Sequence, residues 1–105
     1  MITIKFSAVN GRLCGVSLAG HATADADDAD GRLVCAAVSS AVYCAVNTIG
    51  EIVKADINVT DKGDFFSVTV KNRLSESQVT LQGLKLHLTE LSKQYHDKIK
   101  VISEV

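Results

Sequence analysis

The residues that decide the fold run from Leu33 to Lys54, LVCAAVSSAVYCAVNTIGEIVK. Apolar residues recur there at spacings of three and four, the pattern of a helix with one buried face. They are Val34, Val38, Ala41, Val42, Ala45, Ile49, Ile52 and Val53. Asp30 is the predicted N-cap, and Gly31 eases the turn into the helix. This start places Cys35 within or near the first helical turn.

A predicted hairpin and an acidic loop precede this helix. Residues 2–8 alternate apolar and polar side chains, which predicts a strand. Asn10-Gly11 follows, a pair that tolerates the positive φ angles of a type I′ turn, and residues 12–19 form the return strand. Residues 22–31, ATADADDADG, are small and acidic without an apolar period, which indicates a surface loop.

After the first helix the same pattern of two strands and a helix returns. Residues 55–60 and 65–70 alternate and predict a second strand pair joined by a turn. A second helix is expected after Ser75, because Ser75 with Gln78 has the form of a capping box. Its apolar stripe is Leu81, Leu84, Leu88, Leu91 and Tyr95. Residues 99–105 predict a last strand.

The resulting order is ββαββαβ, an α+β fold with one mostly antiparallel sheet and two helices. A length of 105 residues suits a single domain over residues 1–105. The hydrophobic fraction of 47% and the charged fraction of 22% are ordinary for a globular protein and argue against disorder. No apolar run approaches the roughly 20 residues of a membrane span, and no signal peptide is recognisable at the start. We therefore expect a cytoplasmic protein that does not contact a membrane.

The net charge and the cysteines narrow the classes of partner. Eleven basic residues are offset by twelve acidic ones, so we expect no direct nucleic acid binding. An odd count of three cysteines indicates free thiols in a reducing compartment. A CxxC pair is absent from the sequence, which disfavours a zinc site. We expect neither a metal ion nor a cofactor.

Cys35 and His21 are the candidate catalytic residues. His21 ends the return strand and Cys35 begins the helix, so a loop can bring them together. A thiol attacks as a thiolate, which a helix N-terminus and a nearby imidazolium both stabilise. Histidine is the usual general base at neutral pH, and unpaired first-turn amides can bind an oxyanion. Ser39 lies four residues after Cys35 and shares its face, where it can contact the substrate or the thiol.

The other cysteines have a simpler interpretation as packing residues. Free cysteine is among the most buried residue types in proteins. Cys14 is expected on the apolar face of its strand together with Val16. Cys44 lies nine residues after Cys35, on roughly the opposite side of the helix, and is expected in the core or in an interface.

The remaining histidines, His87 and His96, are expected to face solvent on the second helix. A metal site that joins one of them to His21 and Cys35 has no ligand spacing in its support. A thiol redox protein is disfavoured, since no resolving cysteine is paired with Cys35 in a CxxC motif. A cysteine nucleophile with a histidine base is the stronger hypothesis.

Two segments carry a resemblance to a known family. Gly20-His21-Ala22 and residues 34–39, VCAAVS, resemble the signature of the ribosomal-processing cysteine proteases, and the similarity extends over the whole chain. The resemblance implies a small, homodimeric, cytoplasmic enzyme with the ββαββαβ layout. It also implies removal of a short N-terminal extension from a protein of the large ribosomal subunit. The family's catalytic pair falls on His21 and Cys35.

The chain departs from its relatives around Arg32. Relatives often carry an aspartate at this position, and the loop before it is slightly longer here. If that aspartate orients the histidine, its role is vacant or has moved to Asp30 or Asp28. The gap motivates an alternative function, a ribosome-associated binding module without peptidase activity. The acidic loop, with Asp25, Asp27, Asp28 and Asp30, is expected to help dock a basic substrate.

Overall fold

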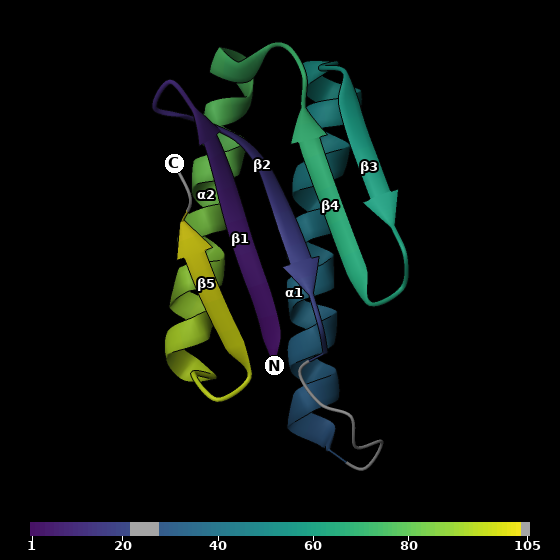
Figure 1. Cartoon of the computed structure of the whole chain (residues 1–105), viewed down its shortest axis with the longest axis vertical. Coiled ribbons are helices and arrows are strands. Elements are labelled where there is room, and N and C mark those ends of the chain that lie inside the picture. Colours follow the sequence, from purple (N-terminus) through teal and green to yellow (C-terminus); the bar gives the residue numbers. More distant parts are fainter. Residues whose placement is uncertain (22–27, 104–105) are drawn as a thin grey trace.

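The computed structural model of the chain describes residues 1–21 and 28–103. Its element order confirms the predicted ββαββαβ layout (Figure 1). The elements are β1 (Ile2–Val9), β2 (Arg12–Ala19), α1 (Ala29–Asn47), η1 (Thr48–Val53), β3 (Ile57–Asp61), β4 (Phe65–Val70), α2 (Leu74–Gln94) and β5 (Ile99–Ser103). The segment η1 is a π-helical continuation of α1.

The five strands form one mixed sheet in the order β3-β4-β2-β1-β5. Three neighbouring pairs are antiparallel, and only β1 with β5 is parallel, with Ile2 opposite Ile99. Both helices lie behind the same face of the sheet (Figure 1). The fold therefore has two layers, with the core between them.

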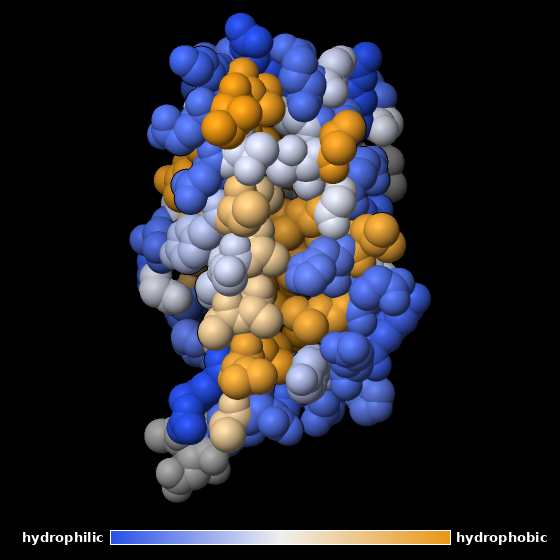
Figure 2. All heavy atoms as spheres, turned by 180° about the vertical axis from the view of Figure 1, so that it is seen from behind, coloured by the Kyte–Doolittle hydropathy of each residue, from blue (hydrophilic) through white to orange (hydrophobic). Residues whose placement is uncertain are grey.

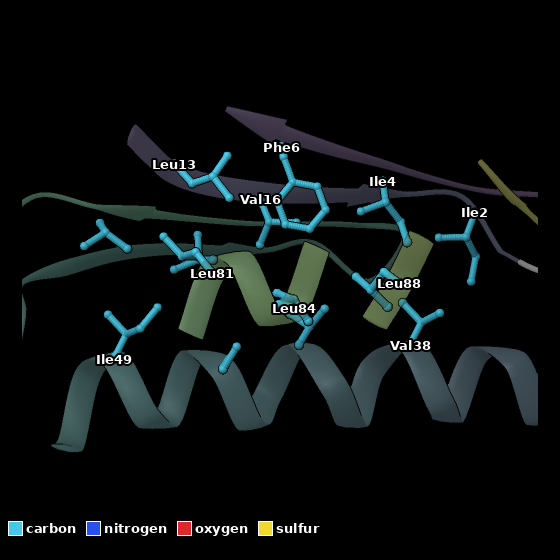
Figure 3. Packing of buried hydrophobic residues seen from close by; sticks show 14 of the residues in the cluster. Ile2, Ile4, Phe6, Leu13, Val16, Val38, Ile49, Leu81, Leu84 and Leu88 are labelled. Carbon is cyan, nitrogen blue, oxygen red and sulfur yellow. The ribbon is translucent and has the colours of Figure 1, made fainter. Parts of the chain in front are cut away.

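The core is built from the inward residues of the sheet and one stripe of each helix (Figure 3). Ile4 and Phe6 of β1 are fully buried, and Leu88 of α2 is as well. On α1 the buried apolar residues are Val34, Val38, Val42 and Ala45. Burying one such side chain stabilises the fold by about 1.5–3 kcal/mol, so this stripe fixes how α1 lies on the sheet.

Helix α1 begins earlier than the sequence predicted, and its N-cap is Asp28 rather than Asp30. Asp28 Oδ1 accepts a hydrogen bond from the Gly31 N–H at 3.0 Å, the usual contact of an N-cap side chain. Asp28 Oδ2 also accepts one from Lys98 Nζ at 2.8 Å. Mainly through that hydrogen bond, Asp28 raises the pKa of Lys98. Asp28 is therefore the N-cap and has two hydrogen-bond partners, whereas Asp30 lies exposed in the first turn.

Helix α2 also differs from its prediction at the start. It begins at Leu74 after Arg73, which adopts a left-handed conformation and caps with no side chain, so the Ser75–Gln78 capping box is not formed. Gln78 Oε1 instead accepts a hydrogen bond from the Leu13 N–H at 2.9 Å, and Gln78 Nε2 donates one to the Leu13 carbonyl at 2.7 Å. Pairing of β2 with β4 begins only at Gly15, so Gln78 acts in place of a strand beyond the end of β4.

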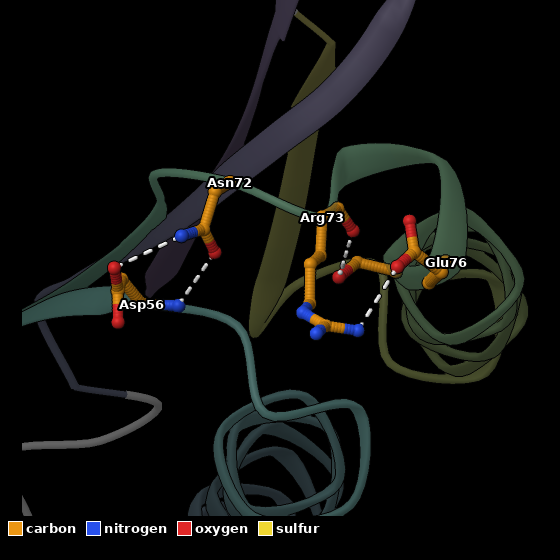
Figure 4. A network of polar contacts seen from close by, with 5 residues as sticks. Asp56, Asn72, Arg73 and Glu76 are labelled. Atoms are coloured by element: carbon orange, nitrogen blue, oxygen red, sulfur yellow. Dashed lines mark hydrogen bonds and ion pairs between the residues drawn. The ribbon is translucent and has the colours of Figure 1, made fainter.

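A polar network closes the end of the molecule where β4 passes into α2 (Figure 4). The Asn72 side chain accepts a hydrogen bond from the Asp56 N–H at 2.8 Å and donates one to the Asp56 carboxylate at 2.9 Å. Arg73 pairs with Glu76 at 3.3 Å on the exposed surface. These contacts hold the start of β3 against the end of β4, away from the catalytic candidates.

By length and composition, residues 29–53 could cross a membrane. The same test is passed by core helices, and α1 with η1 is such a helix. Val34, Val38 and Ile49 of this segment are almost fully buried against the rest of the fold. Packing on the sheet accounts for the apolar residues of this buried face, whereas Leu33 and Ile52 of the same segment are exposed.

Candidate active site

The backbone around His21 is held by two other segments. The Gly20 N–H donates to the Asp64 carbonyl at 3.0 Å, and the Met1 ammonium donates to the His21 carbonyl at 2.6 Å. Gly20 has a φ of +85°, and an added Cβ would lie 2.6 Å from the Met1 carbonyl oxygen. Only glycine suits such a position. The turn after β2 thereby places the exposed His21 at a fixed point at the end of the sheet.

Cys35 lies in the second turn of α1, not the first, because the helix begins at Ala29. It is half-buried and packs against the core. Six positions along a helix are about 9 Å, so the unpaired first-turn amides lie well before Cys35. Gly31, one of these amides, already donates to Asp28. The predicted oxyanion site at the first turn of α1 beside Cys35 is therefore wrong.

One pocket brings three of the predicted residues together. His21 from the end of β2 and Cys35 and Ser39 from α1 line a cavity of about 280 Å³. Cys35 and Ser39 are one helical turn apart, which explains why both reach it. In the described part of the chain, His21 and Cys35 share the pocket without a direct hydrogen bond. Asp30 does not line it.

Aromatic side chains form a wall of this pocket that the sequence analysis missed. Tyr43 of α1 and Phe66 of β4 meet edge to face, with ring centroids 5.8 Å apart and planes at 75°. Phe65 lines the pocket beside them. The sequence could have indicated Tyr43, because it follows Ser39 by four residues and so shares its face of the helix. Phe65 and Phe66 were assigned only to a strand, and periodicity does not show which pocket a strand end reaches.

The turn between β3 and β4 also contributes to the pocket, through Asp61, Gly63 and Asp64. This turn was predicted as a simple connector. It reaches the site because β4 pairs with β2, which places Phe65 opposite Ala19 and the turn beside Gly20. Two acidic side chains thus border the candidate catalytic residues from a segment that is distant in the sequence.

The other cysteines lie outside this pocket. Cys14 is buried as expected, but a register shift opposite Ser7 and Ala8 leaves it out of the core cluster that contains Val16. Cys44 is exposed, so a place in the core is wrong. It lines a groove between α1 and α2 together with His87. Among the described residues, no group of three or more potential ligands could hold a metal ion.

Comparison with known proteins decides the family. A family model described as cysteine protease Prp matches residues 1–100. The chain belongs to this family. A comparison with curated protein sequences gave no match. Membership in Prp makes the chain a cysteine-type peptidase and accords with a pocket that contains a cysteine and a histidine.

Solved structures share the fold. The ribosomal processing protease Prp of Staphylococcus aureus, in complex with a covalently linked product peptide, has a TM-score of 0.87 at 23% identity, over 99% of this chain and 100% of that one. The same enzyme with a substrate peptide gives 0.86 at 21% identity, with the same coverage. A protein of Streptococcus mutans gives 0.84 at 23% identity, over 99% of both chains. These likenesses establish the two-layer ββαββαβ fold.

Proposed function

We propose that Cys35 is the nucleophile of this Prp protease and His21 its general base. The observation that carries the proposal is their meeting in one pocket, although they come from different layers of the fold. Cys35 Sγ attacks the scissile carbonyl carbon, and His21 accepts the thiol proton. His21 then gives this proton to the leaving amine as the C–N bond breaks. Water hydrolyses the resulting thioester and restores the thiol.

Ser39 is proposed as a contact for the substrate. Its hydroxyl is exposed one turn beyond Cys35 on the same pocket wall. A hydroxyl can donate a hydrogen bond to a substrate carbonyl or accept one from a substrate amide. The aromatic wall formed by Tyr43, Phe65 and Phe66 suits an apolar or aromatic substrate side chain next to the scissile bond.

The proposed substrate is a ribosomal protein of the large subunit with a short N-terminal extension. Support comes from the family and from the Staphylococcus aureus relative, a ribosomal processing protease crystallised with substrate and product peptides. Ribosomal proteins are commonly basic because they contact RNA phosphates, and Asp61 and Asp64 give the pocket an acidic border. An inactive ribosome-binding module is not favoured, because the chain keeps Cys35 and His21 at one pocket of a protease fold.

The test is a cleavage assay on the extended ribosomal protein of the same organism. Mass spectrometry of the products should show loss of a short N-terminal peptide, and prior alkylation of the thiols should prevent it. Cys44→Ala is the matched control, because it removes the more exposed thiol and should leave cleavage and its inhibition unchanged. Cleavage that survives alkylation would exclude a cysteine mechanism.

A homodimer in the cytoplasm is proposed for the assembled enzyme. The surface behind the sheet carries a stripe of small and apolar residues along α1 (Figure 2). Large exposed apolar residues of α1 and η1 include Leu33 and Ile52, which are 65% and 76% exposed. The groove containing Cys44 and Gly83 continues this surface onto α2. We call this surface the helix face; contact with a second copy would remove its apolar area from water.

A further inference from the structure

An aspartate on the β3–β4 turn lines the same pocket as the candidate catalytic histidine. On β4 the inward positions are Phe66, Val68 and Val70, the latter two fully within the core. Side chains alternate along a strand, so the next position on this face is Asp64. It lies just before the first residue of β4, at the edge of the pocket that contains His21. Continued into the turn, this alternation would place the exposed Asp64 on the face of β4 that carries Phe66.

The backbone fixes Asp64 relative to His21. The Asp64 carbonyl accepts the Gly20 N–H at 3.0 Å, and Gly20 directly precedes His21. Within residues 1–21 and 28–103, the Asp64 carboxylate makes no hydrogen bond or ion pair, and neither does the His21 imidazole. The two groups thus face one cavity with their hydrogen-bonding capacity unused. Hydrogen bonds of catalytic groups often tighten only when substrate is bound.

The other described carboxylates near the site are less suited to this contact. Asp28 uses one oxygen to cap Gly31 and the other to bind Lys98. Asp30 is exposed on the first turn of α1 and does not line the pocket. Asp61 lines the pocket, but its Oδ1 accepts the Gly63 N–H at 3.1 Å and closes the turn. Among the carboxylates near the pocket in the described part of the chain, Asp64 is the one whose side chain has no other hydrogen bond or ion pair.

We propose that Asp64 is the positioning residue of His21, and this inference rests on the proposed function of His21 and Cys35. The Asp64 carboxylate accepts a hydrogen bond from Nδ1–H of the imidazole, which leaves Nε2 facing the Cys35 thiol. Once His21 has taken the thiol proton, the carboxylate also stabilises the imidazolium. The proton remains on His21, and Asp64 stays ionised throughout. Asp64 would thereby orient the histidine in place of the aspartate that relatives often carry at the position of Arg32.

The experiment compares Asp64→Asn with Asp61→Asn, which makes the same change of charge in the same turn. The amide oxygen that Asp61→Asn introduces can still accept the Gly63 N–H, so the turn is retained in the control. Steady-state cleavage of an extended ribosomal peptide gives kcat and KM. We expect Asp64→Asn to lower kcat by about 10-fold or more, part of the roughly 10²–10⁴ that a general base contributes, in addition to any change in KM that it shares with Asp61→Asn. Asp61→Asn removes an equal charge from the pocket border, so any change that it makes should fall on KM, and Asp64→Glu should recover part of the loss in kcat.

A second readout observes the imidazole itself. Nitrogen-15 NMR distinguishes the protonation of Nδ1 from that of Nε2, and His21→Ala identifies the His21 signals. We expect Nδ1–H in the parent protein and a changed distribution in Asp64→Asn. Unchanged His21 signals in that variant, or a loss confined to KM, would overturn the inference and make Asp64 a substrate contact. Cys35→Ala separates the two levels: its activity would refute the proposed function, whereas an inactive Cys35→Ala beside a fully active Asp64→Asn refutes only Asp64.

Discussion

Helix α1 carries two cysteines on different sides, and each lines a pocket or groove together with a histidine from another part of the chain. The two cysteine–histidine pairs differ in their surroundings. Cys35 and His21 share a pocket walled by α1, the sheet and the β3–β4 turn. Cys44 and His87 share a groove lined by residues of α1, η1 and α2. Cys35 is half-buried, whereas Cys44 is exposed. The residue types are the same, so the difference lies in the aromatic side chains and the two aspartates that line the first pocket and do not line the groove.

The largest difference in cleavage between the two cysteine–histidine pairs is expected when each thiol is removed. Cys35→Ala should abolish cleavage and leave the fold intact, because it removes the nucleophile and little volume. Cys44→Ala should cleave at the parental rate. Product formation followed by mass spectrometry, with circular dichroism as the folding control, measures both. Parental turnover by Cys35→Ala would mean that the pocket is not the active site.

The histidines should show the next largest difference. His21→Ala is expected to lower kcat/KM by roughly 10²–10⁴-fold, the usual contribution of a general base, and His87→Ala should have little effect. His21→Ala should also slow the alkylation of Cys35 at neutral pH, because the imidazolium no longer stabilises the thiolate. Peptide mapping separates Cys35 from Cys44. Equal alkylation of Cys35 with and without His21 would show that the two do not interact.

A charged substitution in the groove is expected to change the oligomeric state of the protein. Cys44→Arg places a charge on the helix face and should convert the proposed dimer into a monomer, since a buried unpaired charge costs several kcal/mol. Val9→Arg is the matched control, since Val9 is also exposed but lies at the far end of β1. Light scattering at micromolar concentration measures the mass. A parent protein that is already monomeric would exclude the dimer.

The acidic loop should give a smaller, salt-dependent effect. Asp25 and Asp27 lie outside the described residues, so the expectation rests on the sequence alone. Replacing both with Asn should lower kcat/KM for a basic substrate about 2- to 10-fold at low salt and very little at high salt, because ions screen charges beyond roughly 8–10 Å. Asp28 is left unchanged in this test, because it caps α1. A loss that is equal at all salt concentrations would contradict electrostatic docking.

The smallest effect is expected on stability, from the hydrogen bond between Lys98 and Asp28. Lys98→Met should lower the melting temperature slightly and leave the catalytic residues in place. The hydrogen bond to Asp28 raises the pKa of Lys98, so its contribution is complete below pH 10.5 and is lost as pH rises through the higher value of the folded state. Thermal melts at neutral pH and at a pH above that folded-state value should therefore differ less in Lys98→Met than in the parent.

The sequence was sufficient for the elements and for the choice of the catalytic candidates, because both depend on local signals. Alternation and three-to-four spacing located the strands and helices, and Asn10-Gly11 located the first turn. Capping was less predictable. Asp28 and Asp30 are equally good N-cap types, and the choice depended on Lys98, a partner 70 residues away.

The surroundings of His21 and Cys35 could not be predicted, because they depend on strand order. Asp64 and Phe66 line the pocket of His21 because β4 lies beside β2, while β1 lies on the other side of β2. No local pattern in residues 61–66 encodes that order. The bulge at Cys14 is a further example, because it depends on how β1 and β2 register against each other.

The parallel pairing of β1 with β5 has a consequence for synthesis of the chain. Ile2 and Ile99 are neighbours in the sheet, so during synthesis β1 receives this neighbour only after all the residues between them have emerged from the ribosome. Until then one edge of β1 stays open to other strands, a risk of mispairing that completed sheets avoid. Contacts so distant in sequence also slow folding. The nascent chain is therefore most vulnerable to aggregation just before β5 is released.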